Sequence, residues 1–110
     1  MMYVNFEAGN KAYKLRLNTR NTIALEKTLG CNPLHIFDAT GERMPEVTTL
    51  VTVLHAALQQ FHHGVTMNDA CDIFDAYLDD GHTVDEFIYI VLDVYRESGL
   101  IPKEVDSEKN

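Results

Sequence analysis

The chain has 110 residues, of which 45% are hydrophobic, and its formal net charge at pH 7 is −8. We expect one domain over residues 1–102, because a chain of this length can bury a core without disulfides or metals. No apolar run approaches the roughly 18–20 residues that cross a membrane, which argues against a membrane protein. Residues 64–110 carry twelve Asp or Glu and only three Lys or Arg, which argues against nucleic acid as a partner.

The start of the chain and its cysteines favour a cytoplasmic protein. The sequence does not open with a basic segment followed by an apolar run, so we expect no secretory signal. Cys31 and Cys71 do not form a disulfide framework and fit the reduced thiols of a cytoplasmic protein better.

Residues 2–18 predict a β-hairpin. Apolar residues at positions 13, 15 and 17 alternate with Lys14 and Arg16, which is typical of a strand with one buried and one solvated face. Gly9-Asn10 suits the turn, because both residues tolerate positive φ. A two-stranded hairpin is marginal alone, so its apolar face should pack on helices.

Two short helices are expected next, over residues 20–29 and 33–39. Their capping residues are Asn18 or Thr19 at the start of the first, Gly30 at its end, and Asn32-Pro33 at the start of the second. Ile23, Leu25 and Leu29 supply the apolar contacts of the first helix, and Leu34 and Phe37 those of the second. Residues 40–44 are expected to form a loop.

The central helix of the core is predicted over residues 46–62, between Pro45 and Gly64. Apolar residues recur there at the i, i+3, i+4, i+7 spacing, namely Val47, Leu50, Val51, Leu54, Ala57, Leu58 and Phe61. Thr49, Thr52, His55, Gln59 and Gln60 leave only a narrow polar edge. A helix this apolar needs neighbours on most sides, so the other elements should surround it.

Two capping boxes predict the last helices, over residues 67–79 and 84–97. Thr66 with Asp69 begins the first, and Thr83 with Glu86 begins the second. The inner face of the first should hold Met67, Ala70, Cys71, Phe74, Tyr77 and Leu78. The composition of the second also fits a buried strand, although its capping box and length favour a helix. Residues 103–110 predict a flexible acidic tail, which completes an α+β fold: a hairpin on four to five helices.

The sequence predicts neither catalysis nor a cofactor. Aligning Gly81 with the glycine of a calcium loop places Ala76, Leu78 and Phe87 at ligand positions, where oxygen ligands are needed. The histidines and cysteines follow no zinc-site spacing and no nucleophile signature. We therefore expect a non-enzymatic protein without a metal or small-molecule substrate.

The expected helix over residues 84–97 has more apolar residues than one packing stripe uses. Phe87, Ile88, Val91, Leu92 and Tyr95 suffice to dock it on the core. Tyr89, Ile90 and Val94 then need another cover, and large apolar groups left exposed on a helix mark an interface. These three residues are the predicted partner-binding face, for self-association or for another protein.

Residues 13–37, YKLRLNTRNTIALEKTLGCNPLHIF, resemble the start of tail assembly chaperones of long-tailed bacteriophages. In both, a strand of alternating apolar residues leads into a short helix with an Ala-Leu-Glu core, here Ala24-Leu25-Glu26. A glycine and a short Pro/Leu segment follow, here Gly30 and Asn32-Pro33-Leu34. The later apolar helices and acidic end also fit the family in layout.

The resemblance implies a cytoplasmic protein of the bacterial host that binds the long helical tape-measure protein. Such chaperones keep this client soluble while tail-tube subunits polymerise around it, so the tail-tube protein is a second expected partner. The short acidic end would suit the shorter of the two forms that frameshifting produces in many such chaperones. The competing hypothesis, suggested by the acidic second half, is an inhibitor that mimics DNA and binds a basic protein.

Overall fold

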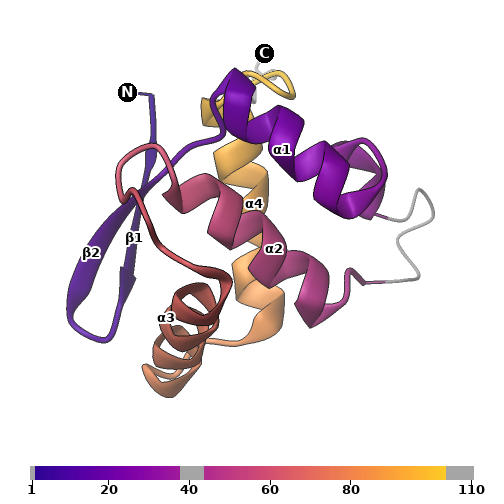
Figure 1. The fold of residues 1–110 in the computed structure, drawn as a ribbon. Helices are drawn as coiled ribbons and strands as arrows, with labels where there is room; N and C mark the ends of the chain where they lie inside the picture. Colours follow the sequence, from indigo (N-terminus) through magenta and orange to yellow (C-terminus); the bar gives the residue numbers. More distant parts are fainter. Residues whose placement is uncertain (1, 38–43, 104–110) are drawn as a thin grey trace, which may run out of the picture.

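The computed structural model describes residues 2–37 and 44–103, where a β-hairpin leads into four α-helices and a short 3-10 helix (Figure 1). The elements are β1 (Val4–Ala8), β2 (Lys11–Leu15), α1 (Thr19–Leu29), η1 (Pro33–Ile36), α2 (Val47–Leu58), α3 (Met67–Asp79) and α4 (Val84–Glu97). This arrangement confirms the predicted α+β class with an N-terminal hairpin.

The hairpin has the turn that its sequence predicts. Phe6 lies opposite Tyr13 in the antiparallel pair, and Gly9 and Asn10 form the turn with φ angles of 60° and 68°. The Gly9 N–H donates to Asp80 Oδ2 over 2.8 Å, which ties the turn to the end of α3. The buried face of the hairpin consists of Phe6, Ala8 and Leu15, with Leu17 just after β2.

Helix α2 is the centre of the core, as its apolar sequence predicts. It contacts α1, α3, α4 and β2, and Figure 1 shows α1, α3 and α4 on different sides of it. Leu50, Leu54 and Leu58 are fully buried along its length. Because β-branched residues give this segment weak intrinsic helix propensity, contacts with its neighbours hold it in place.

The prediction that the central helix runs over residues 46–62 is wrong at its end, because α2 stops at Leu58. The Gln59 side chain explains the early end. Its Nε2 donates to the His55 carbonyl (3.0 Å) and to the Val65 carbonyl (2.8 Å), so it holds the following loop against the last turn. Gly64, with φ 83°, lies in this loop rather than at the helix end.

Both predicted capping boxes are present, and α3 and α4 begin and end at the predicted residues. The Asp69 N–H donates to Thr66 Oγ1 (3.0 Å) and the Glu86 N–H to Thr83 Oγ1 (3.2 Å), while each carboxylate accepts from the cap N–H in return. The final apolar segment is therefore a helix, not a strand. Each cap pairs amide groups that a helix start otherwise leaves unbonded.

The predicted helix over residues 33–39 is instead the shorter 3-10 helix η1, capped by Asn32. Tyr95 Oη donates to the Pro33 carbonyl oxygen over 2.9 Å and so ties η1 to α4. Burial, with a smaller contribution from Cys31, raises the pKa of the Tyr95 hydroxyl. Residues 38–43, with most of the predicted loop, and most of the predicted tail, 104–110, lie outside the described residues.

Several apolar residues that the sequence predicts to face inward are exposed. Each lies at the edge of an apolar stripe or near a helix end, where no neighbouring element covers it. These residues are Ile23, Val47, Phe61, Met67 and Cys71. Phe61 instead contacts Tyr3 edge-on, with 5.5 Å between ring centroids, on the outside of the hairpin.

Candidate functional site

The predicted partner-binding residues on α4 do not share one face. Tyr89 exposes 69% of its surface and Ile90 is half-buried, but Val94 exposes only 2% and belongs to the core. The prediction was wrong for Val94 because it lies seven residues after Phe87 and three after Val91, on the same buried stripe. Tyr89 stands between Asp85 and Asp93, one helical turn away on either side, so its surroundings are acidic rather than apolar.

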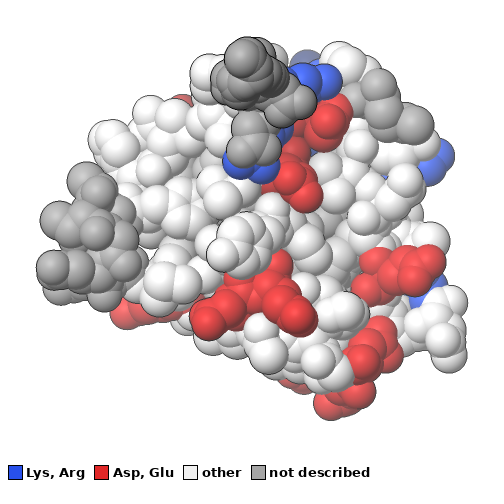
Figure 2. All heavy atoms as spheres, turned by 180° about the vertical axis from the view of Figure 1, so that it is seen from behind, with Lys and Arg blue, Asp and Glu red and all other residues white. Residues whose placement is uncertain are grey.

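The acidic residues gather at the end of the molecule that α3 and the start of α4 form. Figure 2, which views the molecule from behind, shows the larger groups of carboxylates over the middle and lower part of this face, with smaller ones beside Lys and Arg in its upper part. On α3, Asp72, Asp75 and Asp79 are exposed. Asp80 has a structural role here, because its carboxylate holds the Gly9 turn.

His62 has a structural contact that accounts for its position. Its Nε2 accepts a hydrogen bond from the Lys14 backbone N–H over 3.0 Å, and its ring packs edge-on against Tyr13. Burial, and then the positive charge of Lys14, lower the pKa of His62 below its ordinary value of 6.5. The neutral imidazole therefore joins β2 to the loop after α2. Within residues 2–37 and 44–103, no three His, Cys, Asp or Glu side chains are grouped closely enough to hold a metal ion.

A surface groove lies between α1 and α2. Its volume is about 270 Å³ and its walls are largely apolar. The groove is open because small side chains line it. They are Ala24 and Thr28 on α1, and Thr52 and Ala56 on α2. The remaining lining residues are Asn21, Leu25, His55, Gln59 and Met67.

The two threonine hydroxyls of this α1–α2 groove and the Gln59 amide N–H groups are already hydrogen-bonded inside the protein. Thr28 Oγ1 donates to the Ala24 carbonyl (3.1 Å), and Thr52 Oγ1 donates to the Thr48 carbonyl (2.7 Å). Both Gln59 Nε2 bonds likewise end on backbone carbonyls. These donors are therefore engaged within the protein, and the largely apolar walls suit an apolar group.

The size of the groove indicates which apolar group fits. An engineered protein cavity of about 150 Å³ holds one benzene molecule, while small-molecule sites occupy roughly 300–1,000 Å³. At about 270 Å³, the α1–α2 groove has room for one or two large side chains, such as Leu or Phe. This is the scale of an anchor residue on a partner protein rather than of a cofactor.

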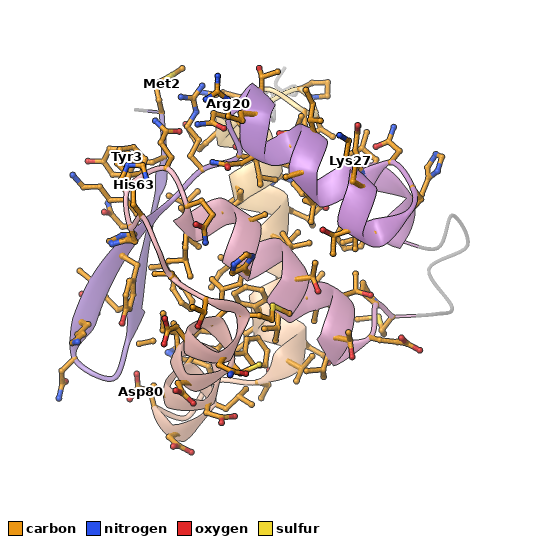
Figure 3. All side chains as sticks on the ribbon, in the orientation of Figure 1. Met2, Tyr3, Arg20, Lys27, His63 and Asp80 are labelled. Carbon is orange, nitrogen blue, oxygen red and sulfur yellow. The ribbon has the colours of Figure 1, made fainter. Side chains whose placement is uncertain are left out.

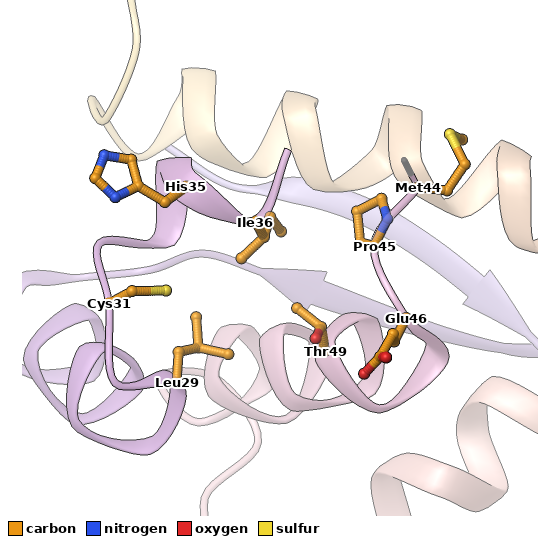
Figure 4. Close-up of a pocket in the computed structure, with 8 residues that line it drawn as sticks. All are labelled: Leu29, Cys31, His35, Ile36, Met44, Pro45, Glu46 and Thr49. Atoms are coloured by element: carbon orange, nitrogen blue, oxygen red, sulfur yellow. The ribbon is translucent and has the colours of Figure 1, made fainter. Parts of the chain in front are cut away.

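A second recess, of about 500 Å³, opens between η1 and the start of α2 (Figure 4). Leu29, Cys31 and His35 lie on one side of it, and Pro45 and Glu46 lie on the other. Residues 38–43 join these two sides and lie outside the described residues. The α1–α2 groove, whose lining is described throughout, is therefore the candidate binding site.

Sequence reasoning did not find the α1–α2 groove. One signal was present: small residues at i, i+4 on both helices, Ala24 and Thr28 on one and Thr52 and Ala56 on the other. Such pairs place small side chains on one face. The sequence does not say, however, that the two faces meet, because α1 and α2 are separated by η1 and the following segment.

These features define a small α+β protein with an exposed apolar groove between two of its helices. The chain belongs to a family of proteins of unknown function, DUF6096, whose sequence model matches residues 4–109. Searches among curated proteins and among solved structures find no match. No helix of the described residues is both long enough and apolar enough to cross a membrane.

Proposed function

We propose that this protein is a tail assembly chaperone of a bacteriophage or prophage, which binds the tape-measure protein and keeps it soluble during tail-tube assembly. The observation that carries the proposal is the α1–α2 groove, an apolar recess sized for side chains of a partner. The resemblance of residues 13–37 to such chaperones supplies the class of client. The proposed activity is binding, without catalysis, cofactor or metal.

The groove is suited to a long helical client because helices commonly bind grooves through a few apolar anchors on one face. Before assembly, the apolar faces of a long helical chain are exposed to water and favour aggregation. A chaperone that covers one anchor at a time can lower this exposure without enclosing the client. Several copies would then bind along one tape-measure chain.

The second candidate function is an acidic inhibitor that binds a basic nucleic-acid-binding protein. The exposed row Asp72, Asp75 and Asp79 on α3 favours it, together with the net charge of −8. The two functions depend on different surfaces and different forces. Apolar anchoring persists at high salt, whereas binding between exposed charges is screened there.

Co-expression with the tape-measure protein encoded in the same genome tests the proposal. We expect the client to be soluble and to co-purify with this protein at both low and high salt. A client that stays insoluble with and without this protein would contradict the proposal. Binding to a basic DNA-binding protein that is lost at about 0.5 M salt, with no effect on the client, would favour the inhibitor.

A further inference from the structure

A polar hollow adjoins one end of the apolar groove. Its volume is about 670 Å³, and it is formed by the start of α1 and the loop after α2. Asn21 and Gln59 line both the hollow and the groove, so the two recesses adjoin each other. Arg20 and His63 also line the hollow, together with Asn18, Thr19 and Gln60. In Figure 3, Arg20 lies at the start of α1, on the same side of the molecule as His63.

The hollow carries positive charge on an otherwise acidic protein. Among the described residues, no carboxylate lines it and no ion pair engages Arg20. The stretch from residue 47 to residue 68, which supplies the α2 wall and the loop, contains neither Asp nor Glu. A negatively charged partner group would therefore meet attraction here, although the net charge of the chain is −8.

We infer that the groove and the hollow form one composite site, which takes an amphipathic helical segment of the client carrying a large apolar residue and a carboxylate one turn away. The apolar residue fills the groove between Ala24 and Ala56, and the carboxylate pairs with Arg20. The two partner residues must be three or four positions apart, because this spacing makes them neighbours on one face of a helix, one turn from each other. This inference rests on the proposed chaperone function and specifies which client segments bind.

Arg20 suits this role better than a surface lysine would. Its planar guanidinium can make two parallel hydrogen bonds to one carboxylate, which adds geometric selection to the charge attraction. Lys27 provides a matched comparison on the same helix. It is exposed, lines none of the recesses described above, and lies about two helical turns from Arg20 (Figure 3).

The test uses overlapping, fluorescently labelled 20-residue peptides that cover the tape-measure protein, titrated by anisotropy against the intact chain. We expect the binding peptides to be those with Leu or Phe and a carboxylate three or four positions away. Arg20→Glu should weaken their binding about tenfold or more, because it places like charges together, whereas Lys27→Glu should change it less than about threefold. Circular dichroism of each variant checks that the fold is intact.

Exchanging the charge of Arg20 with that of the peptide carboxylate tests their pairing most directly. A peptide whose Glu is replaced by Lys should bind the wild type poorly and bind the Arg20→Glu variant at least tenfold better, which a merely structural role of Arg20 would not produce. Equal effects of Arg20→Glu and Lys27→Glu would overturn the composite site. Solubilisation of the whole client without binding of such peptides would also overturn it and leave the chaperone function standing. Failure to solubilise the client would reject both the composite site and the chaperone function.

Discussion

At the scale of single residues, the buried contacts explain why some polar and apolar side chains were mispredicted. Val94 was expected on a partner face, yet it is part of the core because the buried stripe of α4 is wider than one row. His62 lies in the loop after α2 and accepts a hydrogen bond from the Lys14 N–H of β2, a contact that its local sequence does not predict. In both cases a neighbouring element, and not the local sequence, decides the environment.

The contrast between Val94 and Tyr89 can be tested by the same substitution at both sites. Val94→Asp should unfold the protein or abolish its cooperative melting, because it buries a charge without a partner. Tyr89→Asp should lower the free energy of unfolding by no more than about 1 kcal/mol, since its side chain is largely exposed and the new charge meets only Asp85 and Asp93 one turn away. Urea melts followed by circular dichroism measure both. Equal destabilisation would show that the α4 packing is described wrongly.

The lowered pKa of His62 predicts a pH dependence of stability. The unfolded chain binds a proton at this residue near pH 6.5, whereas the folded protein resists it. The contribution of His62 to stability is therefore complete above about pH 6.5 and is lost as the pH falls below that value. His62→Gln keeps a hydrogen-bond acceptor but cannot titrate, so its stability should fall less between pH 7.5 and pH 5.5. If the free energy of unfolding fell equally in wild type and variant over this pH range, the contact of His62 with the Lys14 N–H would be contradicted.

At the scale of elements, local signals determined where α3 and α4 begin, while a side-chain contact with the following loop determined where α2 ends. The bounds of α3 and α4 were predictable because each start has a capping box that acts within four residues. The end of α2 was not, because Gln59 ends the helix through a hydrogen bond to Val65, beyond the helix. The helix predicted over residues 33–39 was also too long, because η1 ends at Ile36 and Phe37 has an extended backbone; residues 38 and 39 lie outside the described residues.

The central position of α2 predicts a large loss of stability when its core is truncated. Leu54 exposes 1% of its surface, in the middle of the helix. Leu54→Ala should lower the free energy of unfolding by about 2–5 kcal/mol, because it leaves a cavity that rigid neighbours cannot fill. The exposed Ile23→Ala is the control, with an expected change within about 0.5–1 kcal/mol. A loss below 1 kcal/mol for Leu54→Ala would place α2 at the surface.

At the scale of the whole molecule, charge and apolar surface are separated. The acidic groups gather on α3 and the start of α4 (Figure 2), whereas the groove lies between α1 and α2, with Arg20 and His63 at one end. The sequence indicated the acidic half, since charge can be counted along the chain. It could not indicate the groove, which exists only because two helices that are separate in sequence expose small residues side by side. The fold was thus more predictable than the site.

The most direct test of the proposed function fills the groove and measures the solubility of the client. Ala24 is exposed and lines the groove, so Ala24→Trp should occupy the recess without disturbing the core. Ala12→Trp is the matched control, because Ala12 is an exposed alanine of β2 that lines none of the recesses described above. The measured quantity is the soluble fraction of the co-expressed tape-measure protein. We predict that Ala24→Trp returns this fraction to the level without chaperone while Ala12→Trp retains the wild-type level; equal solubility with both variants would contradict a client site in the groove.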